Sequence, residues 1–153
     1  MVKSFSRCYE TGEEIEHMKV LSIQEPYATL IMEQKKKVET RSWKTKYRGE
    51  IYIHASISKA HIKRITNPKI LDWMKDAQLH FGYIICKAQL VDCIEMTEEY
   101  IEKVKSKEHL EYILGEYKVG RYAWVLENVE VLEQPIPAKG KLGIWTYEKV
   151  LER

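Results

Sequence analysis

Residues 35–56 read KKKVETRSWKTKYRGEIYIHAS, a basic segment that changes abruptly into an apolar one. Its middle part, VETRSW (38–43), has the alternation of a β-strand. Because successive side chains of a strand point to opposite faces, Glu39, Arg41 and Trp43 are expected on one face. The stretch therefore predicts a strand that presents a carboxylate, a guanidinium and an indole together.

The second half of the stretch predicts a turn followed by another strand. YRGE (47–50) has the composition of a turn, and EIYIHA (50–55) alternates again. His54 is expected on the face opposite the isoleucines of this strand, where it either packs through hydrogen bonds or contributes to a binding surface. Two strands joined by a basic connection are thus the expected centre of the fold.

Working outward, short β-rich runs alternate irregularly with helical segments. Strands are expected at 20–24, 83–96, 121–132 and 139–148, with a turn at 135–137. Helices are expected at 26–34, at 57–79 with a break at Asn67–Pro68, after the cap residue Thr97, and at 109–114 closed by Gly115. Six strands with inserted helices and no regular βαβ repeat predict an α+β fold, a small mixed β-barrel with flanking helices.

The composition predicts one domain in a cytoplasmic protein. A chain of 153 residues can bury one sizeable core, and it has no apolar run long enough to cross a membrane. Cys8, Cys86 and Cys93 have no CxxC spacing, and the five histidines show no metal-binding pattern. We therefore expect no disulfide, no metal site, no cofactor and no membrane partner.

Positive charge is concentrated in the opening stretch. Residues 35–48 carry a net +6 although the whole chain carries only +2. The basic residues are Lys35, Lys36, Lys37, Arg41, Lys44, Lys46 and Arg48. One interpretation is a solvated, lysine-rich turn that protects a strand edge. The other is a single-strand nucleic-acid surface, in which Trp43 and Tyr47 stack on bases while the cations hold phosphates.

A smaller group within the stretch has the residue types of a catalytic site. Glu39 and Arg41, at i and i+2, form an ion pair in the simplest interpretation. In a cleft, however, burial and cationic neighbours would lower the pKa of Lys36 and make it a usable base. Arg41 could then hold a phosphate or carbonyl oxygen.

Five blocks of the sequence together resemble the ASCH domain family, a branch of the PUA-like β-barrels. The blocks are LSIQEPYATLI, KKKVETRSWKTKYRGEIYIHAS, GYIICKAQLVDC, GRYAWVLENVEVL and KGKLGIW. The likeness spans residues 18–148, so we expect a domain at 18–153 preceded by an extension at 1–17. The resemblance implies a PUA-like barrel with a cleft beside the motif strand.

The family motif, G-x-K-x-x-E/T-x-R, places Lys36, Glu39 and Arg41 at its functional positions. Gln34 stands where glycine is usual, at a steric cost if its backbone is left-handed. Some relatives are similar to amidohydrolases that deacylate acetylated cytidine with a lysine base, a threonine nucleophile and a later glutamate. Here Glu39 occupies the threonine position, Thr40 is expected on the other strand face, and Glu108 and Glu111 are the candidate acids.

The sequence thus predicts a protein that binds single-stranded RNA or a modified nucleoside. The expected catalytic residues are Lys36 and Glu39, and the expected binding residues are Arg41, Trp43, Lys46, Tyr47, Arg48 and His54. Two alternatives stay open. One is a hydrolase in the same cleft, acting on acetylated cytidine or as a weak metal-independent ribonuclease. The other is a protein-interaction module.

Overall fold

A computed structural model describes residues 4–7 and 13–151 of the chain. Its strands are β1 (Ser4–Arg7), β2 (Glu14–Ile23), β3 (Val38–Arg41), β4 (Gly49–Ala55), β5 (Tyr83–Glu95), β6 (Tyr122–Pro137) and β7 (Ile144–Leu151). Its α-helices are α1 (Tyr27–Met32), α2 (Pro68–Met74), α3 (Glu98–Lys107) and α4 (His109–Ile113), and Ile62–Arg64 forms a 3₁₀ turn, η1.

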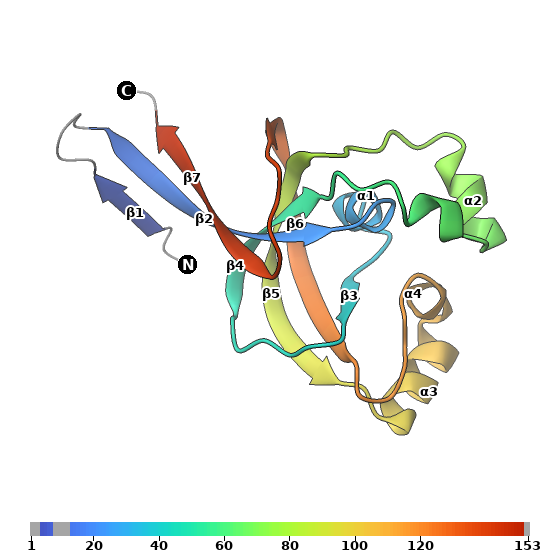
Figure 1. Cartoon of the computed structure of the whole chain (residues 1–153). Helices are drawn as coiled ribbons and strands as arrows, with labels where there is room; N and C mark the ends of the chain where they lie inside the picture. Colours follow the sequence, from blue (N-terminus) through green and yellow to red (C-terminus); the bar gives the residue numbers. More distant parts are fainter. Residues whose placement is uncertain (1–3, 8–12, 152–153) are drawn as a thin grey trace.

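The described strands form one curved mixed sheet in the order β1-β2-β4-β5-β6-β3, with β7 also paired to β2 (Figure 1). The β2–β4 pair is parallel and the other pairs are antiparallel. No backbone ladder of the described residues joins β3 to β2, so hydrogen bonding does not close the sheet. The predicted α+β fold, a small mixed sheet with flanking helices, is confirmed, and one seam of the curved sheet stays open.

The long strands form because their apolar residues can be buried between the curved sheet and α1. The main core is built from isoleucines and leucines of β2, β4, β5 and α1 around the fully buried Trp124 of β6. A second apolar cluster, Leu30, Ile70 and Leu114, joins α1, α2 and α4 at one side of the sheet. These two clusters position the elements between which the cleft described below opens.

Three details differ from the expectation. Residues 57–79 form only η1 and α2 rather than one interrupted helix, although the break at Asn67 is where it was expected. The prolines at 135 and 137 do not end β6, because Pro135 lies in an irregular part of the β5–β6 ladder and Pro137 at its end. Residues 139–143 form a loop, and the last strand begins only at Ile144.

The N-terminal part includes two paired strands. β1 pairs with β2, and β2 continues without a break from Glu14 to Ile23, through the expected boundary between residues 17 and 18. In Figure 1 these strands and β7 project from the body of the domain. Cys8 lies outside the described residues, whereas Cys86 and Cys93 are free thiols.

Candidate nucleotide-binding cleft

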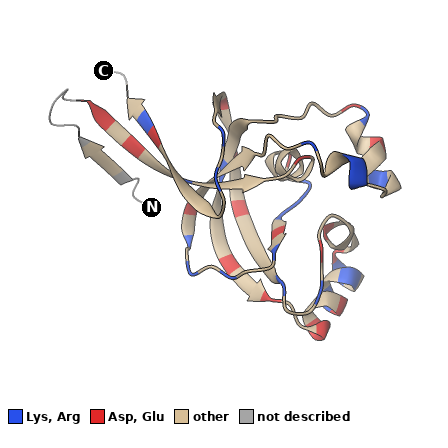
Figure 2. Ribbon diagram, in the orientation of Figure 1, with Lys and Arg blue, Asp and Glu red and all other residues tan. Residues whose placement is uncertain are grey.

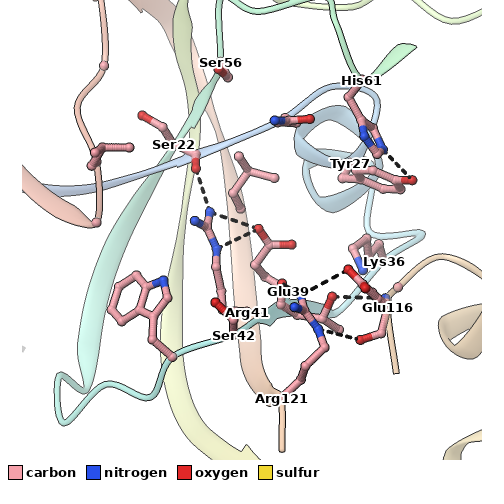
Figure 3. Close-up of a pocket in the computed structure, with 18 of the residues that line it drawn as sticks. Ser22, Tyr27, Lys36, Glu39, Arg41, Ser42, Ser56, His61, Glu116 and Arg121 are labelled. Atoms are coloured by element: carbon pink, nitrogen blue, oxygen red, sulfur yellow. Dashed lines mark hydrogen bonds and ion pairs between the residues drawn. The ribbon is translucent and has the colours of Figure 1, made fainter. Parts of the chain in front are cut away.

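A cleft of about 770 Å³ opens where β3, α1, α4 and the loop 139–143 meet (Figure 3). Its lining includes four of the residues predicted from the sequence, namely Lys36, Glu39, Arg41 and Trp43. It also includes Tyr27, His61, Glu116 and Arg121 and the loop residues Lys139, Lys141 and Leu142. The motif strand β3 therefore forms one wall of a cavity, as the family resemblance implied.

The end of α1 directs Lys36 toward this cleft. The N–H of Gln34 donates to the carbonyl of Ile31, and the N–H of Lys35 donates to that of Leu30. This is the Schellman arrangement, which needs a left-handed residue after the helix cap, and Gln34 has φ +62°. Gln34 therefore has the left-handed backbone that carries the steric cost considered for this position, and this turns the chain so that Lys36 points inward.

Lys36 is the most unusual side chain of the cleft. It is only 1% exposed, and its Nζ has no hydrogen-bond partner among the described residues. The Tyr27 ring centroid lies 5.8 Å from this Nζ. Burial lowers the pKa of the Lys36 ammonium, an effect that the carboxylates of Glu39 and Glu111 oppose. The buried amine of Lys36 therefore loses its proton more readily than the amine of an exposed lysine.

Glu111, one of the two candidate acids, lies on the side of Lys36 that faces α4. Its Oε1 accepts the N–H of Lys37, while its Oε2 and the hydroxyl of Tyr117 are buried without a hydrogen-bond partner in the described part of the chain. Burial raises the pKa of the Glu111 carboxyl, although the Lys36 charge lowers it. Glu108 is exposed. Of the two candidates, the fold therefore brings Glu111 under the electrostatic influence of Lys36.

Glu39 and Arg41 are joined on one face of β3, as the strand pattern predicted. Nε and Nη2 of Arg41 both approach Oε2 of Glu39, at 3.1 and 3.0 Å. Nη2 also donates to the carbonyl of Ser22 at 2.7 Å. Arg41 is thus fixed by two elements, and Glu39 is held against the cation rather than projecting freely into the cleft.

Two aromatic rings that sequence reasoning missed lie at another side of the cleft. The Tyr27 hydroxyl and His61 Nε2 are 3.1 Å apart, and their ring centroids are 5.2 Å apart. Burial, and secondarily the Glu39 carboxylate, raises the pKa of Tyr27. His61 stands in a segment that was expected to be helical and belongs to no motif, so the sequence offered no signal for it.

Of the predicted stacking residues, only Trp43 lines the cleft. It is 39% exposed, and its ring packs edge-on against Trp124 with centroids 4.6 Å apart. Tyr47 instead donates its hydroxyl to the carbonyl of Glu50 and packs against the main core. Lys46 and Arg48 also lie outside the lining, and Arg48 is near Asp92 at 3.8 Å.

His54 is buried behind the cleft, where its hydrogen bonds are made within the protein. Its Nε2 lies 2.7 Å from the carbonyl of Ala138, so this nitrogen donates, and Nδ1 accepts from the hydroxyl of Ser22 at 2.9 Å. The indole N–H of Trp145 donates to the same hydroxyl. Burial lowers the pKa of His54, although the bond to Ala138 opposes the effect. The arrangement is that of a hydrogen-bonded packing residue.

Thr40 and Arg121 complete the lower rim of the cleft. Thr40, which was expected on the other strand face, also lines the cavity, and its hydroxyl accepts the N–H of Glu116 at 3.1 Å. Arg121 donates to the carbonyls of Thr40 and Glu116 at 3.2 and 3.1 Å. Both side chains therefore attach β3 to the segment that follows α4, which fixes the width of the cleft there.

The basic stretch loses part of its charge to pairing. Lys35 contacts Glu33 at 3.0 Å, Arg41 contacts Glu39, and Lys36 is buried. Further cations, Lys139 and Lys141, come instead from the loop before β7 (Figure 2). Between them and β7 stands Leu142, which is fully exposed at the cleft rim.

Residues 4–7 and 13–151 contain no group of three or more His, Cys, Asp or Glu side chains arranged to hold a metal ion. Within the same residues, no helix combines the length and apolarity needed for a membrane span.

The chain has recognisable similarity to known proteins. A search of curated proteins finds human Activating signal cointegrator 1, 23% identical over 134 residues; the match covers 87% of this chain but only 23% of that protein. Among solved structures, an ASCH protein from Zymomonas mobilis has 21% identity and a TM-score of 0.49, over 78% of this chain and 73% of that one. The profile of the ASCH domain matches residues 21–136, more than half of the chain. The chain therefore belongs to the ASCH domain family.

Proposed function

We propose that the cleft binds one base of a single-stranded RNA, or a modified nucleoside, with Lys36 as its central polar contact. The observation that carries this proposal is the buried Nζ of Lys36 in the cleft lining, which has no hydrogen-bond partner in residues 4–7 and 13–151. A buried donor without a partner costs about 1–3 kcal/mol, and more if charged. A ligand carbonyl oxygen would satisfy this donor, so the cost in the free protein is recovered on binding.

The size and lining of the cleft support a nucleoside-sized ligand. Its volume of about 770 Å³ lies within the usual range for small-molecule sites. Trp43 and Leu142 offer apolar surface to a base, while Glu39 can accept from an exocyclic amine. Base stacking on an aromatic ring contributes about 1–3 kcal/mol, which makes Trp43 the expected second contact.

The rim supports binding of a polyanion rather than of a neutral molecule. Lys139 and Lys141 line the opening and make no ion pair with the described residues. For a single strand, log affinity falls with log salt by about 0.7 per phosphate contact, so three or four contacts give a slope of about −2 to −3. A slope near zero would contradict phosphate binding.

The test compares the wild type with Lys36→Met, which keeps the volume of the side chain but removes its amine. Fluorescence anisotropy with a short single-stranded RNA should show at least about a 10-fold loss of affinity, since a hydrogen bond to a charged group contributes about 1.5–3 kcal/mol. Thermal stability should be kept or increased, because the buried amine has no partner. Lys103→Met on α3 is the control. Wild-type affinity in Lys36→Met would overturn the proposal.

A second candidate, hydrolysis of an amide on an acylated base, is supported by the opposite pKa shifts of two neighbouring groups. Burial favours the neutral amine of Lys36 and the protonated carboxyl of Glu111. A neutral Lys36 could take a proton from water as the resulting hydroxide attacks the acyl carbonyl. The amide C–N bond then breaks, the base amine receives a proton, and the carboxylic acid is released.

This second candidate has its own measurement. Mass spectrometry follows a short RNA that contains one acetylated cytidine, incubated with the wild type or with Lys36→Met. Loss of the acetyl group with the wild type alone would establish the hydrolase, and shortening of the chain would establish a ribonuclease. An unchanged oligonucleotide in both samples would exclude these two reactions and leave the binding function.

A further inference from the structure

We infer that a second basic surface, outside the cleft, binds the phosphates of the RNA that flank the bound base. This surface consists of Lys59, Lys63, Arg64 and Lys69, which we call the flank cations. The inference rests on the proposed function. Its starting observation is that residues 51–71 contain these four cations and no aspartate or glutamate.

The flank cations keep their charge free for a partner. No ion pair joins any of them to another residue in the described part of the chain. All four are exposed, and within the described residues only Lys59 has an aromatic ring below its ammonium, that of Phe81 at 5.2 Å. By contrast, Lys35, Arg41 and Arg48 of the basic stretch each lie within 4 Å of a carboxylate.

Packing holds this segment in a defined position. Ile65 and Ile70 belong to the apolar cluster that joins α1, α2 and α4. The Asn67 side chain accepts the N–H of Lys69 at 2.9 Å and so caps α2. Ile65 and Ile70 thus face the body, while Lys63, Arg64 and Lys69 remain outside. Such a platform presents its charges with little loss of backbone entropy on binding.

His61 connects this surface to the cleft. His61 lines the cavity and contacts Tyr27, and it lies two residues before Lys63 and two after Lys59. Since an extended chain spans at most about 3.3–3.6 Å per residue, these two lysines have their Cα atoms within about 7 Å of that of His61. Figure 2 shows the basic ribbon of this segment beside α1, at the edge of the domain.

The partner that this arrangement fits is a strand of RNA passing from the cleft across His61. Phosphates recur regularly along such a strand, and exposed cations on either side of a cleft-lining residue can contact phosphates next to the bound base. The loop lysines Lys139 and Lys141 line the same cleft as His61, so cations from two segments that are distant in the sequence would contact the strand.

The test separates the cleft from the flank by ligand length. The triple variant Lys63→Ala/Arg64→Ala/Lys69→Ala is compared with the wild type on a dinucleotide and on a single-stranded RNA of about 12 nucleotides, within the usual site sizes. Affinity for the longer RNA should fall at least about 10-fold, and its salt slope should become less steep by about 2, that is about 0.7 for each of three contacts. Affinity for the dinucleotide should stay as in the wild type.

A matched control removes three exposed cations elsewhere. Lys103→Ala/Lys105→Ala/Lys107→Ala on α3 changes net charge equally and should bind both ligands as the wild type does. The inference is overturned if the flank variant keeps full affinity for the longer RNA, if it weakens the dinucleotide equally, or if the α3 variant loses as much. If the wild type binds neither ligand, the proposed function itself fails, which is a distinguishable result.

Discussion

The guanidinium of Arg41 donates to the carbonyl of Ser22 at 2.7 Å and thereby links β3 to β2 across the seam that no backbone ladder closes. The same guanidinium holds Glu39. One side chain thus performs two tasks, because it joins the edge strand β3 to β2 and fixes the carboxylate of the cleft. A motif arginine that looks purely functional in the sequence is also a structural connection.

Replacing Arg41 with lysine should therefore destabilise the fold although the charge is kept. A lysine cannot reproduce the planar fork that reaches Ser22 and Glu39 together. Losing these charge-assisted bonds should cost about 1–3 kcal/mol in the free energy of unfolding, measured by urea denaturation. Arg48→Lys, whose pair with Asp92 is exposed, should have a much smaller effect. An equal loss of unfolding free energy in the two variants would contradict the proposal that Arg41 stabilises the fold by linking β3 to β2.

Gln34→Gly should stabilise the protein, because Gln34 has φ +62° and glycine adopts this conformation without steric cost. The expected gain is about 1 kcal/mol, reduced somewhat by the greater freedom of glycine in the unfolded chain. Gln34→Ala, which keeps the strain, should show no gain. Chemical denaturation of the two variants decides the matter, and equal stability of both would show that the left-handed turn costs nothing here.

The loop 139–143 offers a matched pair of glycines. A Cβ on Gly140 would stand 2.6 Å from Cε1 of His54 and 2.8 Å from the Ser22 hydroxyl, whereas one on Gly143 would meet no atom within 4 Å. Both residues have positive φ. Gly143→Ala should therefore lose about 1 kcal/mol of stability through backbone strain alone, and Gly140→Ala should lose clearly more. A higher melting temperature for Gly140→Ala than for Gly143→Ala would contradict the position of this loop against His54 and Ser22.

Stability should fall as the pH drops through the titration range of His54. Burial lowers its pKa in the folded state, so the unfolded chain takes up the proton first. The neutral imidazole adds to the free energy of unfolding. This stabilisation is complete above the unfolded-state pKa of about 6.5, and it is lost as the pH falls from there through the folded-state pKa. Melting temperatures of His54→Asn should depend less on pH over this range than those of the wild type. His109→Asn, at an exposed position, should keep the wild-type slope.

The sequence predicted those parts of the fold that rest on local alternation or on one motif. The face shared by Glu39 and Arg41 and the helix beginning near Tyr27 follow from neighbouring residues, and both are present. The left-handed backbone at Gln34 was suggested only by the glycine of the family motif, and it too is present. Residues 57–79 were interpreted as helical with a break at Asn67–Pro68. Packing against α1 and α4 instead left that segment largely irregular.

The cleft itself was predicted only in part, since its walls come from distant segments. Trp43 and Tyr47 look equivalent in the sequence, but only Trp43 reaches the cavity, because the Tyr47 ring is used by the core. His61 and the loop lysines are brought to the site by tertiary packing, which no local pattern encodes. The choice between Glu108 and Glu111 likewise depended on which side of α4 faces Lys36.

Cross-linking tests the location of RNA binding most directly. A single-stranded RNA with one 4-thiouridine is irradiated with the protein, and mass spectrometry identifies the attached residues. We expect cross-links at Trp43, His61 and the loop 139–143, with their loss when unlabelled RNA competes. Competable cross-links confined to α3 or to the β1–β2 strands, with none around Lys36, would contradict a base-binding cleft.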